Sequence, residues 1–115
     1  MSAIEQGGVF IYDFGPHSDS RQEGVRPVLV VQTDMLNRLE AYSLTIVVPF
    51  TTKGKNTVAH VAVEPSRGNG LDARSFAKCE QLYTIPKMAL RESIGKIARE
   101  DLYRVKEALS MILAL

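Results

Sequence analysis

Residues 26–32 read Arg26-Pro-Val-Leu-Val-Val-Gln32, a nearly continuous apolar run with its proline at the start. A proline is tolerated at the first residue of a strand, because its missing N–H does not interrupt the interior of the ladder. Unbroken apolar residues are typical of a strand that is buried on both faces. We therefore expect a buried strand over residues 26–32, with the rest of the fold built around it.

Shorter strands are predicted on both sides of this segment. Residues 8–14 are rich in β-branched and aromatic side chains and end at Gly15-Pro16, which favours a turn. The later predicted strands cover residues 43–51, 58–64, 75–85 and 94–97. Polar stretches suited to exposed loops are found at residues 15–24, 52–57 and 65–74. One helical turn is predicted at residues 33–38.

The last segment has the pattern of an amphipathic helix that starts near Arg99. Its apolar residues recur at intervals of three and four and are Leu102, Val105, Leu109 and Ile112. Ala98 stands at the expected N-cap, where Ser, Thr or Asp would stabilise the helix by about 1 kcal/mol. Five or six short strands followed by one helix indicate a compact antiparallel sheet or barrel of the α+β class. The 115 residues suffice for one domain, which we expect to span residues 1–115.

Charge and hydropathy limit the classes of function. Fourteen Lys and Arg against 13 Asp and Glu give a net charge of +1, so binding to a nucleic acid requires locally clustered positive charge. The longest apolar stretches, 44–50 and 111–115, are far shorter than the roughly 20 residues that cross a bilayer. The first residues lack the basic region and apolar core of a signal peptide. We expect a cytoplasmic protein with no membrane partner.

The cysteine and histidine content argues against a metal centre. Cys79 is the only cysteine, so an intrachain disulfide is impossible. No Cys/His group has the spacing of metal ligands, so neither a metal nor another cofactor is expected. His17 and His60 are interpreted as surface or loop histidines.

Several short motifs, in this order, resemble the MazF/PemK family of toxin-antitoxin ribonucleases. They are Gly8-Val9, Asp13-Phe-Gly-Pro16, Gly24-Val-Arg-Pro-Val-Leu-Val30, Asn37-Arg38, Val48-Pro-Phe-Thr-Thr52, Lys78-Cys-Glu-Gln81 and Thr84-Ile85. The motif around Arg26 would be weak evidence alone, since any buried strand can begin with Arg-Pro. Together the motifs extend the resemblance from Gly8 to the terminal helix.

The resemblance implies an SH3-like β-barrel of about five to seven short antiparallel strands with a C-terminal helix. It also implies a homodimer with an RNA-cleaving groove across its interface. The implied activity is that of a toxin: sequence-specific, metal-independent cleavage of single-stranded RNA. The implied partner is a cognate antitoxin whose disordered acidic and apolar tail folds along the groove. Operator DNA would be contacted only through that antitoxin.

Two candidate catalytic residues lie at strand ends. An arginine that precedes an apolar strand, such as Arg26, is usually a solvated edge residue, although its planar donors match a phosphate better than lysine does. A threonine that ends a strand, such as Thr51, usually hydrogen-bonds the backbone of the next turn. By resemblance, Arg26 matches the catalytic arginine of the family, and Thr51 matches the threonine that holds the scissile phosphate.

Lys78 and Glu80 are two residues apart in a predicted strand, so we expect them on the same face. They form either an acid-base pair or a surface ion pair worth less than about 1 kcal/mol. In PemK-like members a basic and an acidic residue at these positions take part in proton transfer, although arginine and aspartate stand there. Cys79 points to the opposite side and is predicted to be a core residue.

Further side chains are expected to contact RNA. They are His17, Arg21, Gln22, Thr52, Lys53 and Gln81. Arg21 stands where many relatives have an acid and adds positive charge beside the expected groove. His17 shares this loop but does not align with the histidine of PemK-like members.

Two alternatives of a different class remain open at this point. A toxin of the same fold, as in CcdB-type proteins, can poison DNA gyrase by binding rather than by chemistry. A degenerate toxin can also persist as a DNA-binding co-regulator together with its antitoxin. The pairing of Arg26 with Thr51 favours the ribonuclease.

Overall fold

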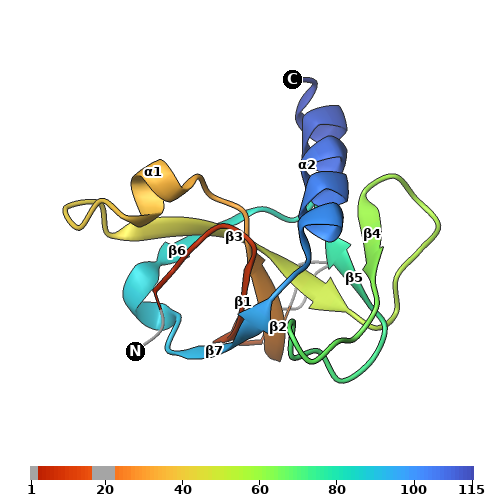
Figure 1. Ribbon diagram of the computed structural model, residues 1–115, viewed down its shortest axis with the longest axis horizontal. Helices are drawn as coiled ribbons and strands as arrows, with labels where there is room; N and C mark the ends of the chain where they lie inside the picture. Colours follow the sequence, from red (N-terminus) through yellow and green to blue (C-terminus); the bar gives the residue numbers. More distant parts are fainter. Residues whose placement is uncertain (1–2, 17–22) are drawn as a thin grey trace.

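The computed structural model describes residues 3–16 and 23–115, and within these ranges seven strands form one curled antiparallel sheet (Figure 1). The strands are β1 (Gly8–Asp13), β2 (Val25–Val30), β3 (Leu44–Thr51), β4 (His60–Val63), β5 (Ser75–Lys78), β6 (Tyr83–Pro86) and β7 (Glu92–Lys96). The helices are α1 (Asp34–Asn37), the 3-10 helix η1 (Lys87–Ala89) and α2 (Arg99–Leu113). The spatial order is β4-β5-β3-β2-β1-β7, and β6 also pairs with β3. The predicted α+β class, a small curled antiparallel sheet with a C-terminal helix, is confirmed.

The central strands are buried on both faces, as the apolar run at residues 26–32 predicts. Leu29 and Val48 point to one side, where they pack with the buried Val105 of α2. Val28 and Val47 point to the other side, into a second cluster with Phe10. Pairing of Leu29 with Val48 and of Val28 with Pro49 keeps this alternation in register. The sheet therefore has one face under α2 and one face turned away from it.

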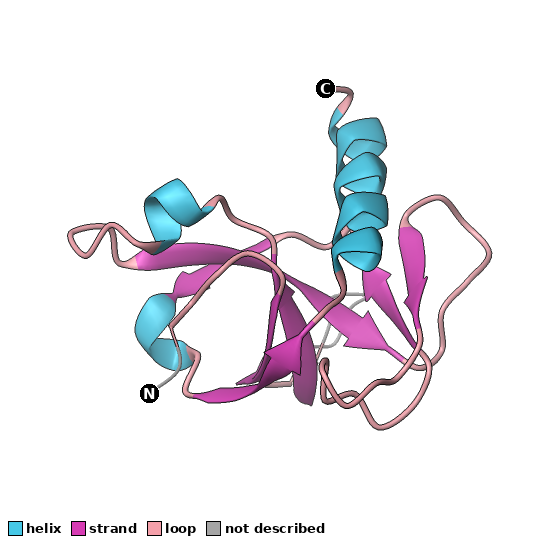
Figure 2. Cartoon of the chain, viewed as in Figure 1, coloured by secondary structure: helices cyan, strands magenta, loops and turns pink. Residues whose placement is uncertain are grey.

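The terminal helix forms where the apolar periodicity predicts it. Ala98 is its N-cap and provides no side-chain hydrogen bond, so packing, rather than capping, holds this end. The apolar stripe that packs against the sheet consists of Leu102, Val105, Ala108, Leu109 and Ile112. The helix ends at Ala114, which adopts a left-handed φ of 57°. In Figure 2 the C-terminal part of this helix projects beyond the sheet.

The prediction of one continuous strand over residues 75–85 is wrong. Phe50 pairs with Ala77 and Val47 with Tyr83, so the five residues 78–82 stand opposite only two residues of β3. The break coincides with Pro49, which has no N–H to donate to a ladder. The segment 79–82 consequently leaves β3 as a bulge, which we call the β5–β6 bulge, between two short strands.

The motif Asn37-Arg38 has a structural role. Asn37 is buried at the end of α1, where its amide donates to the carbonyl of Gln32 at 2.8 Å and accepts from the Thr45 hydroxyl at 2.9 Å. These bonds attach the predicted helical turn at residues 33–38 to β3, so this part of the resemblance supports the fold rather than a site.

Candidate functional site

The strand register places four of the polar side chains on one face of the sheet. Val28 pairs with Pro49, so Arg26 and Thr51, two residues away on each strand, share their face. Thr51 pairs with Phe76, and Lys78, two residues further, pairs with His60. Arg26, Thr51, Lys78 and His60 therefore belong to the face that is turned away from α2.

Arg26 and Thr51 meet at a small hollow of about 190 Å³ at the ends of β2 and β3. Thr52 also lines it, as do Asp72 and Ala73 from the loop that precedes β5. The structure thus brings together three of the predicted site residues from two segments of the chain.

The hydrogen bonds of Arg26 and Thr51 leave part of each side chain for a ligand. Arg26 donates from Nε to the carbonyl of Glu23 at 2.8 Å, and this bond orients the planar guanidinium. The Thr51 hydroxyl accepts from the backbone N–H of Lys53 at 3.1 Å, as is usual for a threonine at the end of a strand. A hydroxyl that accepts in this way still has its own proton to donate. The pair can therefore supply several donors to one phosphate group.

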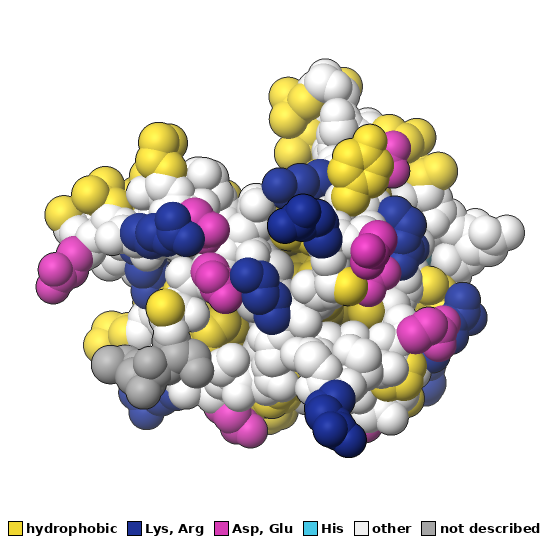
Figure 3. All heavy atoms as spheres, viewed as in Figure 1, with side chains coloured by type: hydrophobic (Ala, Val, Ile, Leu, Met, Phe, Trp, Pro, Cys, Tyr) yellow, Lys and Arg dark blue, Asp and Glu magenta, His cyan; other side chains and the backbone are white. Residues whose placement is uncertain are grey.

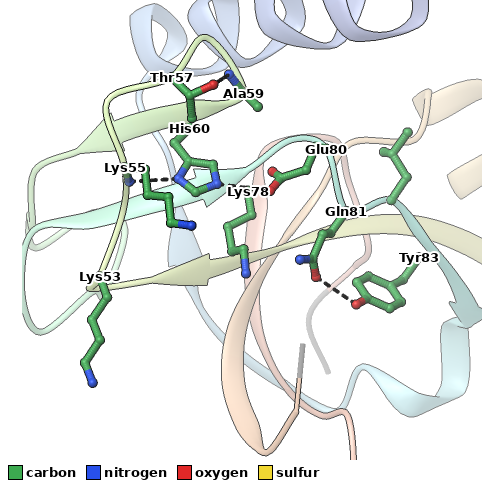
Figure 4. A pocket seen from close by; sticks show the side chains of 10 residues that line it. Lys53, Lys55, Thr57, Ala59, His60, Lys78, Glu80, Gln81 and Tyr83 are labelled. Atoms are coloured by element: carbon green, nitrogen blue, oxygen red, sulfur yellow. Dashed lines mark hydrogen bonds and ion pairs between the residues drawn. The ribbon is translucent and has the colours of Figure 1, made fainter. Parts of the chain in front are cut away.

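A larger hollow of about 880 Å³ lies between the β3–β4 loop and the β5–β6 bulge (Figure 4). It is lined by four of the predicted residues, namely Lys53, Lys78, Glu80 and Gln81. Lys55 adds a third ammonium group, against the single carboxylate of Glu80. This is a local excess of positive charge in a chain whose net charge is only +1, and it favours a polyanionic ligand.

His60 is the principal residue of this hollow that the sequence analysis missed. The expectation of a surface or loop histidine is wrong, because His60 begins β4 and its side chain is only 6% exposed. Its Nε2 lies 3.1 Å from Glu80 Oε2, and its Nδ1 accepts from the backbone N–H of Lys55 at 2.9 Å (Figure 4). The hydrogen-bond partner that the structure gives Glu80 is thus His60, and Glu80 itself lies in the bulge rather than in a strand.

One aromatic ring at the edge of the hollow, that of Tyr83, was also missed, and two further rings continue from it into the sheet. Tyr83 lines it and lies 4.8 Å from Phe14, which in turn lies 4.8 Å from Tyr12, measured between ring centroids. The Tyr83 hydroxyl donates to Gln81 Oε1 at 2.9 Å. Partly exposed aromatic faces beside a basic hollow can stack against unpaired bases. These rings pack against the core residues Phe10 and Ile85, so the sequence pattern does not distinguish them from core residues.

The remaining predictions concern the loop after β1, the cysteine, metal binding and membrane spans. His17, Arg21 and Gln22 lie outside the described residues. Cys79 is fully buried, as predicted, and burial together with the Glu80 charge raises the pKa of its thiol to about 12. Within residues 3–16 and 23–115, no three His, Cys, Asp or Glu side chains come close enough to hold a metal ion. Over the same part of the chain, no helix has the length and hydropathy needed to span a membrane.

Nearly the whole chain matches one known protein family. The sequence profile of the family described as PemK-like, MazF-like toxin of type II toxin-antitoxin system matches residues 5–113. The chain belongs to this family. The predicted resemblance to the MazF/PemK toxins is thereby confirmed, and it extends well beyond the motifs that suggested it.

Individual relatives cover the toxin over nearly its full length. It is 33% identical to endoribonuclease EndoA of Bacillus subtilis over 112 residues, which cover 97% of this chain and 96% of the relative. It is 34% identical to endoribonuclease MazF of Staphylococcus epidermidis over 115 residues, which cover 97% of this chain and 92% of the relative. Its fold is similar, with a TM-score of 0.81 and 24% identity, to an endoribonuclease in complex with its cognate antitoxin from a mycobacterial species. That likeness covers 98% of this chain and 97% of the other.

Proposed function

We propose that this toxin is a sequence-specific, metal-independent endoribonuclease that acts on single-stranded RNA. The observation that carries the proposal is one sheet face that offers Arg26 and Thr51 at one hollow and Lys78 near the His60–Glu80 pair at the next. Two relatives above 30% identity that are named endoribonucleases support it. A toxin that acts only by binding a protein partner does not need phosphate donors beside the ammonium group of Lys78 and the carboxylate of Glu80.

The chemistry follows from the substrate, because RNA carries its own nucleophile. Removal of the 2′-hydroxyl proton lets the 2′-oxygen bond to phosphorus while the bond from phosphorus to the 5′-oxygen breaks. The products are a 2′,3′-cyclic phosphate and a 5′-hydroxyl. The step requires a base, an acid for the leaving oxygen, and donors for the charge that develops on the phosphoryl oxygens.

Each of these tasks has a candidate side chain. Arg26 stabilises the developing charge with its planar donors, and Thr51 donates its hydroxyl proton to hold the phosphate. Glu80 takes the 2′-hydroxyl proton, and Lys78 supplies a proton to the leaving oxygen. Arginine is a poor choice of base because it stays protonated, with a pKa above about 12 in proteins generally.

Binding of the remaining RNA falls to the neighbouring residues. Thr52 and Lys53 continue from the small hollow towards the large one, and Gln81 lies in the bulge beside Glu80. Lys53 contributes to attraction for the backbone, which carries no sequence information. Gln81 and the ring of Tyr83 are suited to contact bases.

We propose two protein partners as well. A second copy of the toxin would cover the exposed apolar side chains of α2 and of the C-terminal residues after it. Hydrophobic surface gathers in this part of the molecule in Figure 3. The exposed apolar residues of this part are Tyr103, Met111, Leu113 and Leu115. A cognate antitoxin with an acidic and apolar tail would fill the lysine-lined hollow, and operator DNA would be reached only through it. Light scattering at micromolar concentration is expected to give the dimer mass, and a monomer mass would contradict the dimer.

The decisive experiment separates 2′-hydroxyl attack from every other mechanism. The cut site in a long single-stranded transcript is mapped first, and an oligonucleotide that spans it is then cleaved in excess EDTA. We expect undiminished cleavage with a cyclic phosphate and a 5′-hydroxyl as products. Replacing the one ribose at the cut site by 2′-deoxyribose should preserve binding and stop cleavage. Continued cleavage of that substrate would contradict attack by the 2′-hydroxyl.

The same preparation discriminates the other two functions. A gyrase poison would leave RNA intact and inhibit supercoiling. A degenerate toxin would do neither and would not arrest growth when it is expressed without its antitoxin.

A further inference from the structure

The hydrogen bonds of His60 determine where its ring proton lies. A backbone N–H can only donate, so the Nδ1 that accepts from Lys55 at 2.9 Å carries a lone pair. The ring proton therefore sits on Nε2, which faces Glu80 Oε2 at 3.1 Å and donates to it. The imidazole is neutral and is held in one tautomer by the backbone of the β3–β4 loop.

Both ring nitrogens are thus occupied, and the side chain is almost fully buried. His60 has no lone pair to offer a substrate, so it cannot itself serve as the base. Glu80 differs: its side chain is 39% exposed, and Oε1 has no hydrogen-bond partner among the described residues. One carboxylate oxygen is fixed by the histidine while the other is left for the hollow that Lys53, Lys55 and Lys78 line.

We infer that His60 is a positioning residue for Glu80, an inference that rests on the proposed role of Glu80 as the base. Glu80 lies in the β5–β6 bulge, outside the ladders that fix strand residues, so its carboxylate needs another constraint. His60 supplies this constraint from the neighbouring strand, 20 residues away in sequence. Two consecutive hydrogen bonds, from the Lys55 N–H to His60 and from His60 to Glu80, connect the β3–β4 loop to the base. A base held in this way can reach the substrate in a reproducible geometry.

Kinetics of three variants on the mapped oligonucleotide test the inference. His60→Leu removes the hydrogen-bond donor and introduces an apolar side chain of comparable size. We expect kcat to fall by up to about 100-fold, with KM nearly unchanged. His60→Gln keeps an N–H near the position of Nε2, so it should recover much of the rate. Asn56→Ala, an exposed change in the same loop, is the control and should retain the wild-type kcat.

A double-mutant cycle with Glu80→Gln separates the two levels of the proposal. If His60 acts through Glu80, then adding His60→Leu to the Glu80→Gln variant should lower kcat no further. A wild-type rate for Glu80→Gln alone would overturn the role of Glu80 as the base. A large loss for Glu80→Gln with none for a folded His60→Leu would instead overturn the positioning role only.

The tautomer is measurable in the wild-type protein, so the inference stays testable even if His60→Leu does not fold. The chain has two histidines, and the spectrum of His60→Gln assigns the signals of His60. Nitrogen-15 NMR of the ring is expected to show a protonated Nε2 and an unprotonated Nδ1. A protonated Nδ1 would contradict the arrangement and overturn the inference.

Discussion

The hydroxyl oxygen of Thr51 accepts a hydrogen bond from the backbone N–H of Lys53 at 3.1 Å. This contact joins the last residue of β3 to the loop that carries two lysines of the large hollow. The usual structural role of a threonine at a strand end and its proposed role at the phosphate are therefore compatible, because the first uses a lone pair and the second uses the proton.

Substitution of Thr51 or Arg26 is predicted to abolish cleavage with the fold intact. Thr51→Val removes the hydroxyl at nearly constant volume, Arg26→Lys removes the planar fork, and each loses one donor to the developing charge. We expect cleavage rates about 100- to 1,000-fold lower and no growth inhibition. Thr51→Ser is the matched control and should remain active. Thermal unfolding midpoints near the wild-type value would verify folding, and a wild-type rate in a folded Arg26→Lys or Arg26→Ala protein would refute the site.

Gly54 is predicted to be necessary for the position of the β3–β4 loop, which carries Lys53 and Lys55. A Cβ at this residue would lie 2.0 Å from the Cγ atom of the Phe76 ring, so Gly54→Ala must displace the loop or the ring. Because Lys53 and Lys55 flank it, we expect cleavage to fall roughly tenfold. Gly68→Ala is the control, since its Cβ would meet nothing closer than 3.8 Å. Equal activity of the two variants would show that the loop geometry does not matter.

Asp34 gives a prediction on acid stability. Burial alone would raise the pKa of Asp34, but hydrogen bonds from the Gln6 N–H and Asn37, with the charges of Arg38 and Lys96, lower it below its ordinary value of 3.8. A carboxyl with a lower pKa in the folded state stabilises fully above pH 3.8 and loses that contribution as the pH falls through the folded value. Denaturant titrations should therefore show the stability gap between wild type and Asp34→Asn shrinking below pH 4 or so. A gap independent of pH would contradict this linkage.

Cys79 is predicted to resist alkylation in the folded toxin. Burial, and secondarily the charge of Glu80, raises the pKa of its thiol to about 12, and only the thiolate reacts. Mass spectrometry after iodoacetamide treatment at pH 8 should detect no adduct on the native protein and a complete one in denaturant. Rapid modification of the native protein would mean that the β5–β6 bulge opens readily.

The sequence predicts the parts of this fold that depend on local pattern. The apolar run at residues 26–32 corresponds to β2 and its first following residues, and the stripe from Leu102 to Ile112 corresponds to the buried face of α2. Each signal is a periodicity that a segment carries by itself. The interruption of the strand after Lys78 was missed because apolar and polar residues keep alternating beyond it, through Cys79 and Glu80. The pairing with β3 is nevertheless interrupted at Val48 and Pro49.

The site could be predicted only residue by residue. Arg26 and Thr51 were found through motifs, yet that they share a face follows from a register that no short motif contains. His60 was missed for a related reason. Its partner Glu80 is 20 residues away, and the contact requires both the pairing of β4 with β5 and the bulge that follows.

The β5–β6 bulge has a consequence for how such toxins diverge. Neither ladder of β3 runs through residues 79–82, so a replacement, or even an added residue, in this segment shifts the register of neither β5 nor β6. Gln81 lies in that segment, whereas Arg26 and Thr51 stand on strands whose register the core enforces. Substitutions of Gln81 can then change the proposed base contacts without shifting either strand, while the proposed phosphate contacts of Arg26 and Thr51 are preserved together with the strands that carry them.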